Sequence, residues 1–363
     1  MPKVSVIMPK VSVIMPKVSV IMPVYNVEDY VEPSIRSLLD QTERDIEIIA
    51  VNDGSTDGSL EVLRRLADAD DRIKVIDQKN AGPSAARNAG MAIATAPIIA
   101  FLDADDFFKP RACERIVELF AEHEADGIDV LTFGADCFPQ EFSTPWHEDK
   151  LHPRDAVYDP FAPDLLFKES SRPFHWRTAV RTGFLRESGI AFDESLRLGE
   201  DQAFHFAIYP RAKRTVLVSD VLYEYRVSRA DSAMDTVTKD RASMMAEHLH
   251  IADVILADWR AGGFLDRYQA EMAAWIVEFV AYDVLFLPAT DRDCLLEGVA
   301  DLLRKYWTPG ELDTLPIAPA TRAILEASLS GKPVSDLRAK RLQLAYYKQQ
   351  YGTRSVVRRL LRR

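Results

Sequence analysis

The stretch Ile98-Ile-Ala-Phe-Leu-Asp-Ala-Asp-Asp106 decides the fold, because an apolar run long enough for one buried strand ends in three carboxylates. A continuous apolar run is typical of a strand in a parallel sheet, and ligands of open α/β sheets bind outside the carboxyl ends of such strands. Asp103 and Asp105 are two apart, so they point the same way on an extended chain. Their oxygens suit Mg²⁺ or Mn²⁺ shared with a substrate diphosphate. A solvated acidic turn is the alternative.

Composition limits the class of protein. The chain has 363 residues, of which 47% are hydrophobic and 28% charged, and this predicts a globular protein of two domains. Its three cysteines are far apart and lack metal-ligand spacing, so we expect reduced thiols in a cytoplasmic protein. The sequence has no run of about 18 apolar residues, so we expect no transmembrane helix. Its N-terminus also lacks the long apolar core that is typical of a signal peptide.

Charge is concentrated at the C-terminal end. Residues 338–363 contain nine Arg and Lys and no Asp or Glu, so the total charge of −11 leaves −20 on the remainder. An acidic body argues against nucleic acid as a partner. Within residues 353–363 the apolar side chains fall on one helical face and five arginines surround it, as in a helix lying on an anionic membrane surface. A frayed basic tail and a partner-docking helix are the alternatives.

The N-terminus repeats one heptapeptide, Met-Pro-Lys-Val-Ser-Val-Ile, from Met1, Met8 and Met15. A proline every seven residues excludes a heptad helix, and the period is too short for a solenoid repeat. We therefore interpret residues 1–16 as a duplicated, β-prone extension before a first strand at 17–22.

Strand-like and helix-like segments then alternate, which predicts βαβ units and a mostly parallel sheet flanked by helices. The further expected strands are 46–51, 73–76, 98–102 and 128–133. From about residue 233 the pattern changes to long helical stretches at 242–256 and 265–287, so residues 233–363 are expected to form a helical C-terminal region.

Polar residues follow several of these strands. Pro23-Val24-Tyr25-Asn26 ends the first strand, and Asp53 follows the second in Asn-Asp-Gly-Ser-Thr-Asp. Asp53 can accept hydrogen bonds from a base or ribose, although Asp and Ser before a helix are also ordinary turn and N-cap residues. Arg87, one turn into the helix after the third strand, can reach a diphosphate or orient an acidic neighbour. The alternative for Arg87 is a solvated helix position.

Together the motifs Pro-Val-Tyr-Asn, Asn-Asp-Gly-Ser-Thr-Asp, Ala-Ala-Arg-Asn and Phe-Leu-Asp-Ala-Asp-Asp resemble the inverting family 2 glycosyltransferases of GT-A fold. The resemblance spans about residues 17–232, with a nucleotide-sugar-binding half at 17–125 and an acceptor and catalytic half at 126–232. It implies that Asp53 contacts the nucleotide base, Asp103 the ribose or metal, and that Asp105 is the principal metal ligand. Residues 23–26, Arg87 and Ala104 would also line the donor site.

The second half contains the expected base. Glu200 and Asp201 begin an apolar helical turn, and the resemblance assigns the base to Asp201 with Glu200 assisting; helix capping by acids is the alternative. Trp176 is a candidate for stacking on an acceptor sugar or, equally, a core residue. Arg226, followed by Arg229 and Ser232, resembles the segment that closes over the donor, though a simple exposed salt bridge is also possible. A third metal ligand among the histidines stays open.

The implied reaction is a single displacement from a nucleotide-diphosphate sugar to a hydroxyl of a glycan or lipid-linked acceptor in cell-surface polysaccharide synthesis. UDP-sugars are the expected donors, with GDP- and dTDP-sugars as alternatives. A sugar nucleotidyltransferase would need a glycine-rich loop after the first strand, where this chain has Pro-Val-Tyr-Asn. A non-catalytic nucleotide-sugar-binding protein would have lost the metal acids or the base. The expected location is cytoplasmic, peripheral on the inner face of the membrane.

Overall fold

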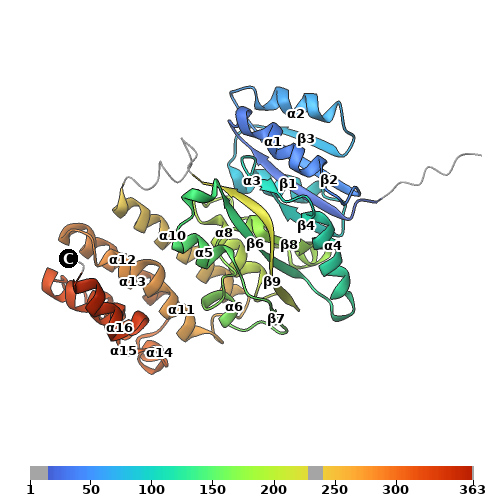
Figure 1. Cartoon of the computed structure of the whole chain (residues 1–363). Helices are drawn as coiled ribbons and strands as arrows, with labels where there is room; N and C mark the ends of the chain where they lie inside the picture. Colours follow the sequence, from blue (N-terminus) through green and yellow to red (C-terminus); the bar gives the residue numbers. More distant parts are fainter. Residues whose placement is uncertain (1–14, 228–239, 362–363) are drawn as a thin grey trace, which may run out of the picture.

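A single mixed sheet organises the N-terminal two thirds of the protein (Figure 1). The structure is a computed structural model and describes residues 15–227 and 240–361; the predicted extension at 1–16 falls almost wholly outside these ranges. Within the described residues the sheet has nine strands in the order β3-β2-β1-β4-β8-β6-β9-β5, and β7 pairs with β9. The strands are β1 (Val18–Val24), β2 (Ile46–Asp53), β3 (Ile73–Gln78), β4 (Ile98–Phe101), β5 (Phe107–Phe108), β6 (Val130–Phe138), β7 (Ala156–Tyr158), β8 (Thr178–Arg181) and β9 (Thr215–Arg226).

The first half follows the predicted βαβ pattern. Strands β1 to β4 pair in parallel, and β1 and β2 are buried along almost their whole length, as their continuous apolar sequences predict. Helices connect these strands, and the first two of them bury one apolar face each. They are α1 (Glu28–Leu39), α2 (Ser59–Ala67) and α3 (Pro83–Ile93).

The second half departs from the expected mostly parallel sheet. Strand β8 lies between β4 and β6 and is antiparallel to both, and β5 and β7 are antiparallel to β9. Only β6 and β9 pair in parallel there. Alternating apolar segments indicate strands but not their order, so the insertion of β8 next to β4 was not predictable. The helices of this half are α4 (Ala112–Glu122), α5 (Pro145–Leu151), α6 (Asp164–Phe167), α7 (Thr182–Ser188) and α8 (Glu200–Ile208).

The C-terminal region is helical, as predicted. Its helices are α10 (Arg241–Ala261), α11 (Gln269–Ile276), the π-helical segment η4 (Val277–Ala281), α12 (Tyr282–Val284), α13 (Ala289–Tyr306), α14 (Pro309–Thr314), α15 (Pro319–Leu329) and α16 (Asp336–Leu361). Helix α16 is broken at Gly352, whose φ is 75°. The side chains of residues 354–363, which carry the predicted amphipathic face, lie outside the described part. Among the described helices none is long and apolar enough to cross a bilayer.

Helix α3 packs directly on β1 at a glycine. A Cβ added to Gly90 would lie 2.5 Å from Cγ2 of Ile21, a fully buried residue of β1. This close approach sets the depth at which α3 sits on the sheet, and α3 also carries Arg87.

We expect Gly90→Ala to lower the free energy of unfolding by about 1–3 kcal/mol, because the added methyl group overpacks the contact with Ile21. Gly183→Ala in α7 is the matched control, since the nearest atom to its added Cβ lies 4.0 Å away, and it should leave stability unchanged or slightly raised. Urea unfolding followed by circular dichroism measures both. Equal effects of the two substitutions would contradict the proposed close contact.

Candidate active site

The acidic turn after β4 is held in place by β9. Asp106 is buried and accepts hydrogen bonds from the Tyr223 hydroxyl at 2.7 Å and the Arg226 backbone N–H at 2.6 Å. The same Tyr223 hydroxyl accepts the backbone N–H of Asp103 at 3.2 Å. Asp106 therefore has a structural role, and the predicted donor-site acids of the turn are the other two, Asp103 and Asp105.

Arg226 anchors this turn from the other side. Its Nε donates to the carbonyl oxygen of Asp105 at 2.7 Å. The guanidinium carbon lies 5.0 to 5.2 Å from the ring centroids of Phe107, Phe138 and Tyr30. Arg226 is thus next to the predicted donor site, whereas Arg229 and Ser232 lie outside the described residues.

Arg87 joins the two halves of the site. Its side chain is 5% exposed and forms ion pairs with Asp103 Oδ1 at 3.2 Å and with Glu200 Oε1 at 3.0 Å. The alternative of a solvated helix position is wrong for Arg87, because its guanidinium is buried between two acids. Its predicted contact with a donor diphosphate stays a prediction. The contact with Glu200 spans 113 positions and connects the strand-end acids with the start of α8.

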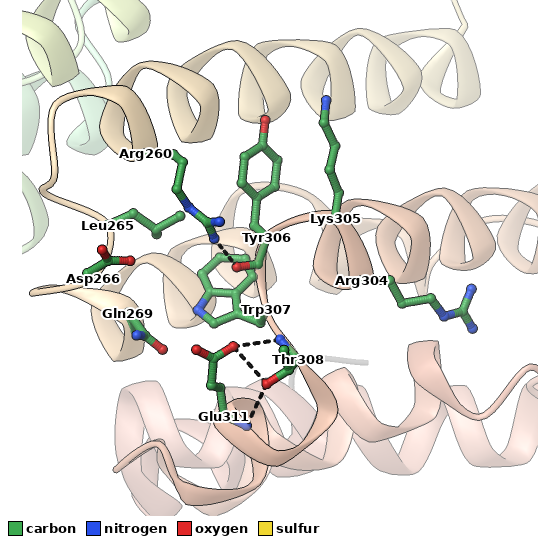
Figure 2. Close-up of a pocket in the computed structure, with 10 residues that line it drawn as sticks. All are labelled: Arg260, Leu265, Asp266, Gln269, Arg304, Lys305, Tyr306, Trp307, Thr308 and Glu311. Atoms are coloured by element: carbon green, nitrogen blue, oxygen red, sulfur yellow. Dashed lines mark hydrogen bonds between the residues drawn. The ribbon is translucent and has the colours of Figure 1, made fainter.

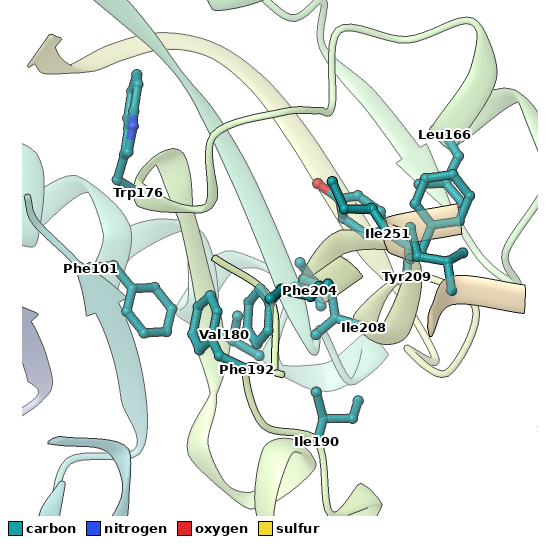
Figure 3. Close-up of a cluster of buried hydrophobic side chains, with 14 of the residues drawn as sticks. Phe101, Leu166, Trp176, Val180, Ile190, Phe192, Phe204, Ile208, Tyr209 and Ile251 are labelled. Carbon is teal, nitrogen blue, oxygen red and sulfur yellow. The ribbon is translucent and has the colours of Figure 1, made fainter. Parts of the chain in front are cut away.

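Arg87 packs against a cluster of aromatic rings, of which Figure 3 shows Phe101, Phe192 and Phe204. The guanidinium carbon lies 5.3 Å from the ring centroid of Phe192, which stacks on Phe204 at 4.2 Å. Phe101, the last residue of β4, meets both rings edge-on at 5.4 and 5.8 Å. These buried rings form an apolar floor next to the ion pairs of Arg87.

Asp201 lies at the start of α8, where the backbone is fixed. Gly199 has φ of 73°, and a Cβ there would lie 2.5 Å from Cδ1 of Ile251 in α10. The Asp201 carboxylate accepts the backbone N–H of Phe174 at 3.0 Å and that of Gln202 at 2.6 Å. Burial, with repulsion from Glu200, raises the pKa of Asp201 to about 6. A carboxylate with this pKa suits general base catalysis near neutral pH.

The acids of the β4 turn fit a divalent cation. Burial raises the pKa of Asp106 well above its usual range and also raises the pKa of Asp103, and the charge of Asp105 adds to both increases. A cation at this turn would relieve that repulsion. Among the described residues no group of three or more His, Cys, Asp or Glu side chains is arranged to hold a metal. Asp105 and Asp103 can therefore supply only part of a coordination shell, as in sites that share Mg²⁺ with substrate phosphates.

The sequence left open which histidine could be a third metal ligand, and His175 is the histidine that lies next to these acids. Its Nε2 is 3.8 Å from Oδ1 of Asp103 and is buried with no hydrogen-bond partner among the described residues. Burial and the neighbouring Arg87 lower its pKa well below 6.5, so the imidazole is neutral. Sequence reasoning missed this placement because the contact depends on the fold of the segment before β8.

Asp53 is tied to the loop after β3. Its Oδ1 accepts from Gln78 Nε2 at 2.8 Å and from the backbone N–H of Ala81 at 3.0 Å, and its Oδ2 accepts from the N–H of Gly82 at 2.8 Å. Asp53 therefore braces the loop after β3 and makes no side-chain cap on α2, and its predicted contact with the nucleotide base stays a prediction. The strand-end segment at residues 23–26 contacts the loop that follows β2. Asn26 Oδ1 accepts the backbone N–H of Thr56 in that loop at 2.8 Å.

Trp176 does not offer a ring face to an acceptor. It is 3% exposed and stacks on Tyr223 at 4.1 Å and on Phe174 at 4.9 Å. The prediction of acceptor stacking is wrong for this residue, because aromatic neighbours on both sides occupy its ring. Sequence reasoning missed Trp146 in α5, which is 50% exposed and meets Phe174 edge-on at 5.8 Å.

Known proteins resemble this chain in sequence and fold. Residues 19–186 match the family described as Glycosyl transferase family 2. EpsJ of Bacillus subtilis, described as an uncharacterized glycosyltransferase, is 35% identical over 56% of this chain, a match that spans 59% of EpsJ, less than two thirds of its length. EpsH of the same organism is 30% identical over 70% of this chain and 72% of its own.

A solved structure extends the similarity to the fold. The crystal structure of S. aureus TarS 1-349 in complex with UDP-GlcNAc superposes with a TM-score of 0.70 at 21% identity and covers 93% of each chain. Its similarity, with the mixed sheet and the helical C-terminal region, identifies the architecture as the GT-A fold. Sequence, fold and the placement of the strand-end acids agree: the chain belongs to glycosyl transferase family 2.

Proposed function

We propose that the protein is an inverting glycosyltransferase that moves a sugar from a UDP-sugar to a hydroxyl of a glycan or lipid-linked acceptor in cell-surface polysaccharide synthesis. The observation that carries this proposal is the buried bridge Asp103–Arg87–Glu200. It brings the acids suited to the donor diphosphate and the acid pair suited to proton abstraction into one cluster. Family membership supports the same class of reaction.

The proposed reaction is a single displacement. Asp201 takes the proton of the acceptor hydroxyl while the acceptor oxygen forms a bond to the anomeric carbon. The bond between that carbon and the diphosphate oxygen breaks on the opposite face, so the configuration inverts and the nucleoside diphosphate leaves. The backbone N–H groups of Phe174 and Gln202 orient the carboxylate for this step.

The hydrogen bonds of Asp53 support a uridine donor. An ionised carboxylate offers about four lone-pair positions, and three are used by Gln78, Ala81 and Gly82. The remaining lone pair, on Oδ2, can accept one hydrogen bond. Uracil presents one N–H donor, whereas guanine presents two adjacent donors. The position therefore matches uracil better than it matches guanine. The UDP-GlcNAc complex of TarS, a protein of the same fold, agrees with this choice.

Mg²⁺ or Mn²⁺ is the proposed cofactor, held by Asp105 and Asp103. When bound, such an ion stabilises negative charge on the departing diphosphate. Arg87 is already neutralised by two carboxylates, so it positions Asp103 rather than supplying a spare positive charge.

For the acceptor we propose Trp146 in place of Trp176. Trp146 is half exposed and contacts Phe174, whose backbone N–H is bound to Asp201. An exposed indole that contacts a neighbour of the base suits stacking on a sugar ring. The basic tail after Gly352, proposed to lie on an anionic membrane, would bring a lipid-linked acceptor close without a membrane-spanning segment.

A panel of UDP-, GDP- and dTDP-sugars with glycan and lipid-linked acceptors tests the function. We expect release of UDP together with a glycosylated product, loss of turnover in EDTA and recovery with Mn²⁺. Mass spectrometry of the product and an assay for nucleoside diphosphate measure this. Pyrophosphate release would instead identify a nucleotidyltransferase, and nucleotide binding without either product would identify a binding protein.

A substitution of the proposed base separates chemistry from binding. Asp201→Asn keeps the size and one acceptor oxygen, so UDP affinity should persist while turnover falls by roughly 10² to 10⁴. Because burial raises the pKa of Asp201 to about 6, the unmodified carboxyl is protonated below that pH, and kcat/KM should rise as pH increases through 6.

Asp193→Asn is the matched control, since this acid lies in the segment before the same helix and its carboxylate accepts hydrogen bonds from the backbone N–H and the hydroxyl of Ser195. It should preserve both turnover and the pH profile. Near-normal turnover of Asp201→Asn at all pH values would remove Asp201 from the chemistry and direct attention to Glu200.

A shortened chain tests the role of the basic tail. Ending the chain after Gly352 removes five arginines, each of which contributes roughly 1 kcal/mol at an anionic surface, so the shortened protein should no longer float with phosphatidylserine vesicles. Salt should weaken the binding of the intact chain. Neutral phosphatidylcholine vesicles are the control, and equal flotation of the two proteins would show that the tail is not the membrane contact.

A further inference from the structure

A cavity lies in the helical C-terminal region, lined by residues other than those of the strand-end site (Figure 2). Its volume is about 370 Å³, within the usual range for small-molecule sites. It is bordered by the end of α10, the segment before α11, and the connection from α13 to α14. The residues on which its chemistry depends are Arg260, Leu265, Asp266, Gln269, Trp307 and Glu311.

Trp307 provides an unused donor in this cavity. Its side chain is 3% exposed, and its Nε1 has no hydrogen-bond partner among the described residues. Figure 2 shows the indole nitrogen directed toward the space between Gln269 and Asp266. A buried N–H without an acceptor is costly, so a ligand oxygen at this point would be favoured.

The other polar groups provide a mixture of donors and acceptors. Arg260 donates to the carbonyl oxygen of Tyr306, and its guanidinium lies over the Tyr306 ring at 5.6 Å. Asp266, Gln269 and Glu311 line the opposite border. Polar groups of both kinds beside an indole face are suited to the hydroxyl groups and apolar ring faces of a carbohydrate.

Charge argues against an anionic ligand. The two further cations of the lining are already paired: Arg304 binds Glu297 and Asp301, and Lys305 binds Asp253 at 2.6 Å. Of the two acids in the lining, Glu311 accepts hydrogen bonds from the backbone N–H and the hydroxyl of Thr308, and Asp266 shares the cavity with Arg260. The charges of the lining are therefore balanced. A neutral ligand fits this balance better than a phosphate.

We infer that this cavity binds a neutral sugar unit of a glycan, at a site separate from the catalytic cluster. The inference rests on the proposed function in one respect, since it assigns the bound sugar to the acceptor or product chain. The donors of Trp307 and Arg260 would bind sugar oxygens, and Asp266 and Gln269 would accept sugar hydroxyls. Such a site would retain a long glycan while its end reacts elsewhere.

The test is a titration of the full chain, without nucleotide sugar or metal, with N,N′-diacetylchitobiose, cellobiose and, separately, inorganic phosphate. Saturation-transfer NMR measures binding. We expect millimolar affinity for a disaccharide, weakened about tenfold by Trp307→Phe, which removes the N–H and keeps an aromatic ring. Gln269→Ala should weaken it similarly.

Trp275→Phe is the matched control. Trp275 is 1% exposed and also has an unpartnered Nε1 within the described part, but it stacks on Phe279 at 4.8 Å and does not line the cavity. This variant should bind the disaccharide normally. Three results would overturn the inference. They are equal weakening of binding by Trp307→Phe and Trp275→Phe, no saturation by either disaccharide up to about 50 mM, and phosphate binding that competes with the sugar.

The two proposals fail separately. If the chain transfers sugar but binds no disaccharide at this cavity, only the remote site is lost. If a disaccharide binds in a Trp307-dependent manner but the nucleotide-sugar panel yields no product, only the proposed function is lost. Trp146→Ala distinguishes binding at this cavity from binding at the proposed acceptor surface. It alters the acceptor surface, so it should leave the Trp307-dependent binding of the disaccharide intact.

Discussion

The buried guanidinium of Arg87 is the interaction on which the site depends. One arginine neutralises an acid after β4 and an acid at the start of α8, so neither half of the cluster is complete without the other. Removing one partner of a buried ion pair leaves an uncompensated charge, which is strongly destabilising. The arginine can occupy this position because α3 approaches β1 closely at Gly90 and because Phe192 and Phe204 form an apolar floor.

The remaining parts of the site are organised around this bridge. Strand β9 fixes the acidic turn through Tyr223 and Arg226, and the segment before β8 fixes Asp201 through the N–H of Phe174. Strand ends and helix starts thus supply the polar groups, while the buried strands and rings supply rigidity. Preorganised groups of this kind need little rearrangement when charge develops during a reaction.

The sequence was sufficient for the parts that depend on local pattern. Continuous apolar runs predicted β1 to β4, and the strand-end acids and Arg87 were identified from their motifs. Position in space was less predictable: nothing along the chain indicates that β8 pairs with β4, that Glu200 meets Arg87 across 113 positions, or that rings on both sides cover Trp176. The unpartnered N–H of Trp307 is likewise a property of packing, because the sequence alone cannot show which donors lack an acceptor.

The edges of the sheet have a consequence for the behaviour of the protein in solution. An unprotected edge strand is a template for pairing with another chain and so for aggregation. Here one edge is β3, whose Lys74 binds Glu47 at 2.5 Å and whose Asp77 accepts from Asn52 at 2.8 Å. At the other end β5 has two residues, and β7 beside β9 has three. Charged side chains on one edge and very short strands on the other disfavour strand-by-strand association, so concentrated solutions of the folded protein should resist fibril growth from the sheet.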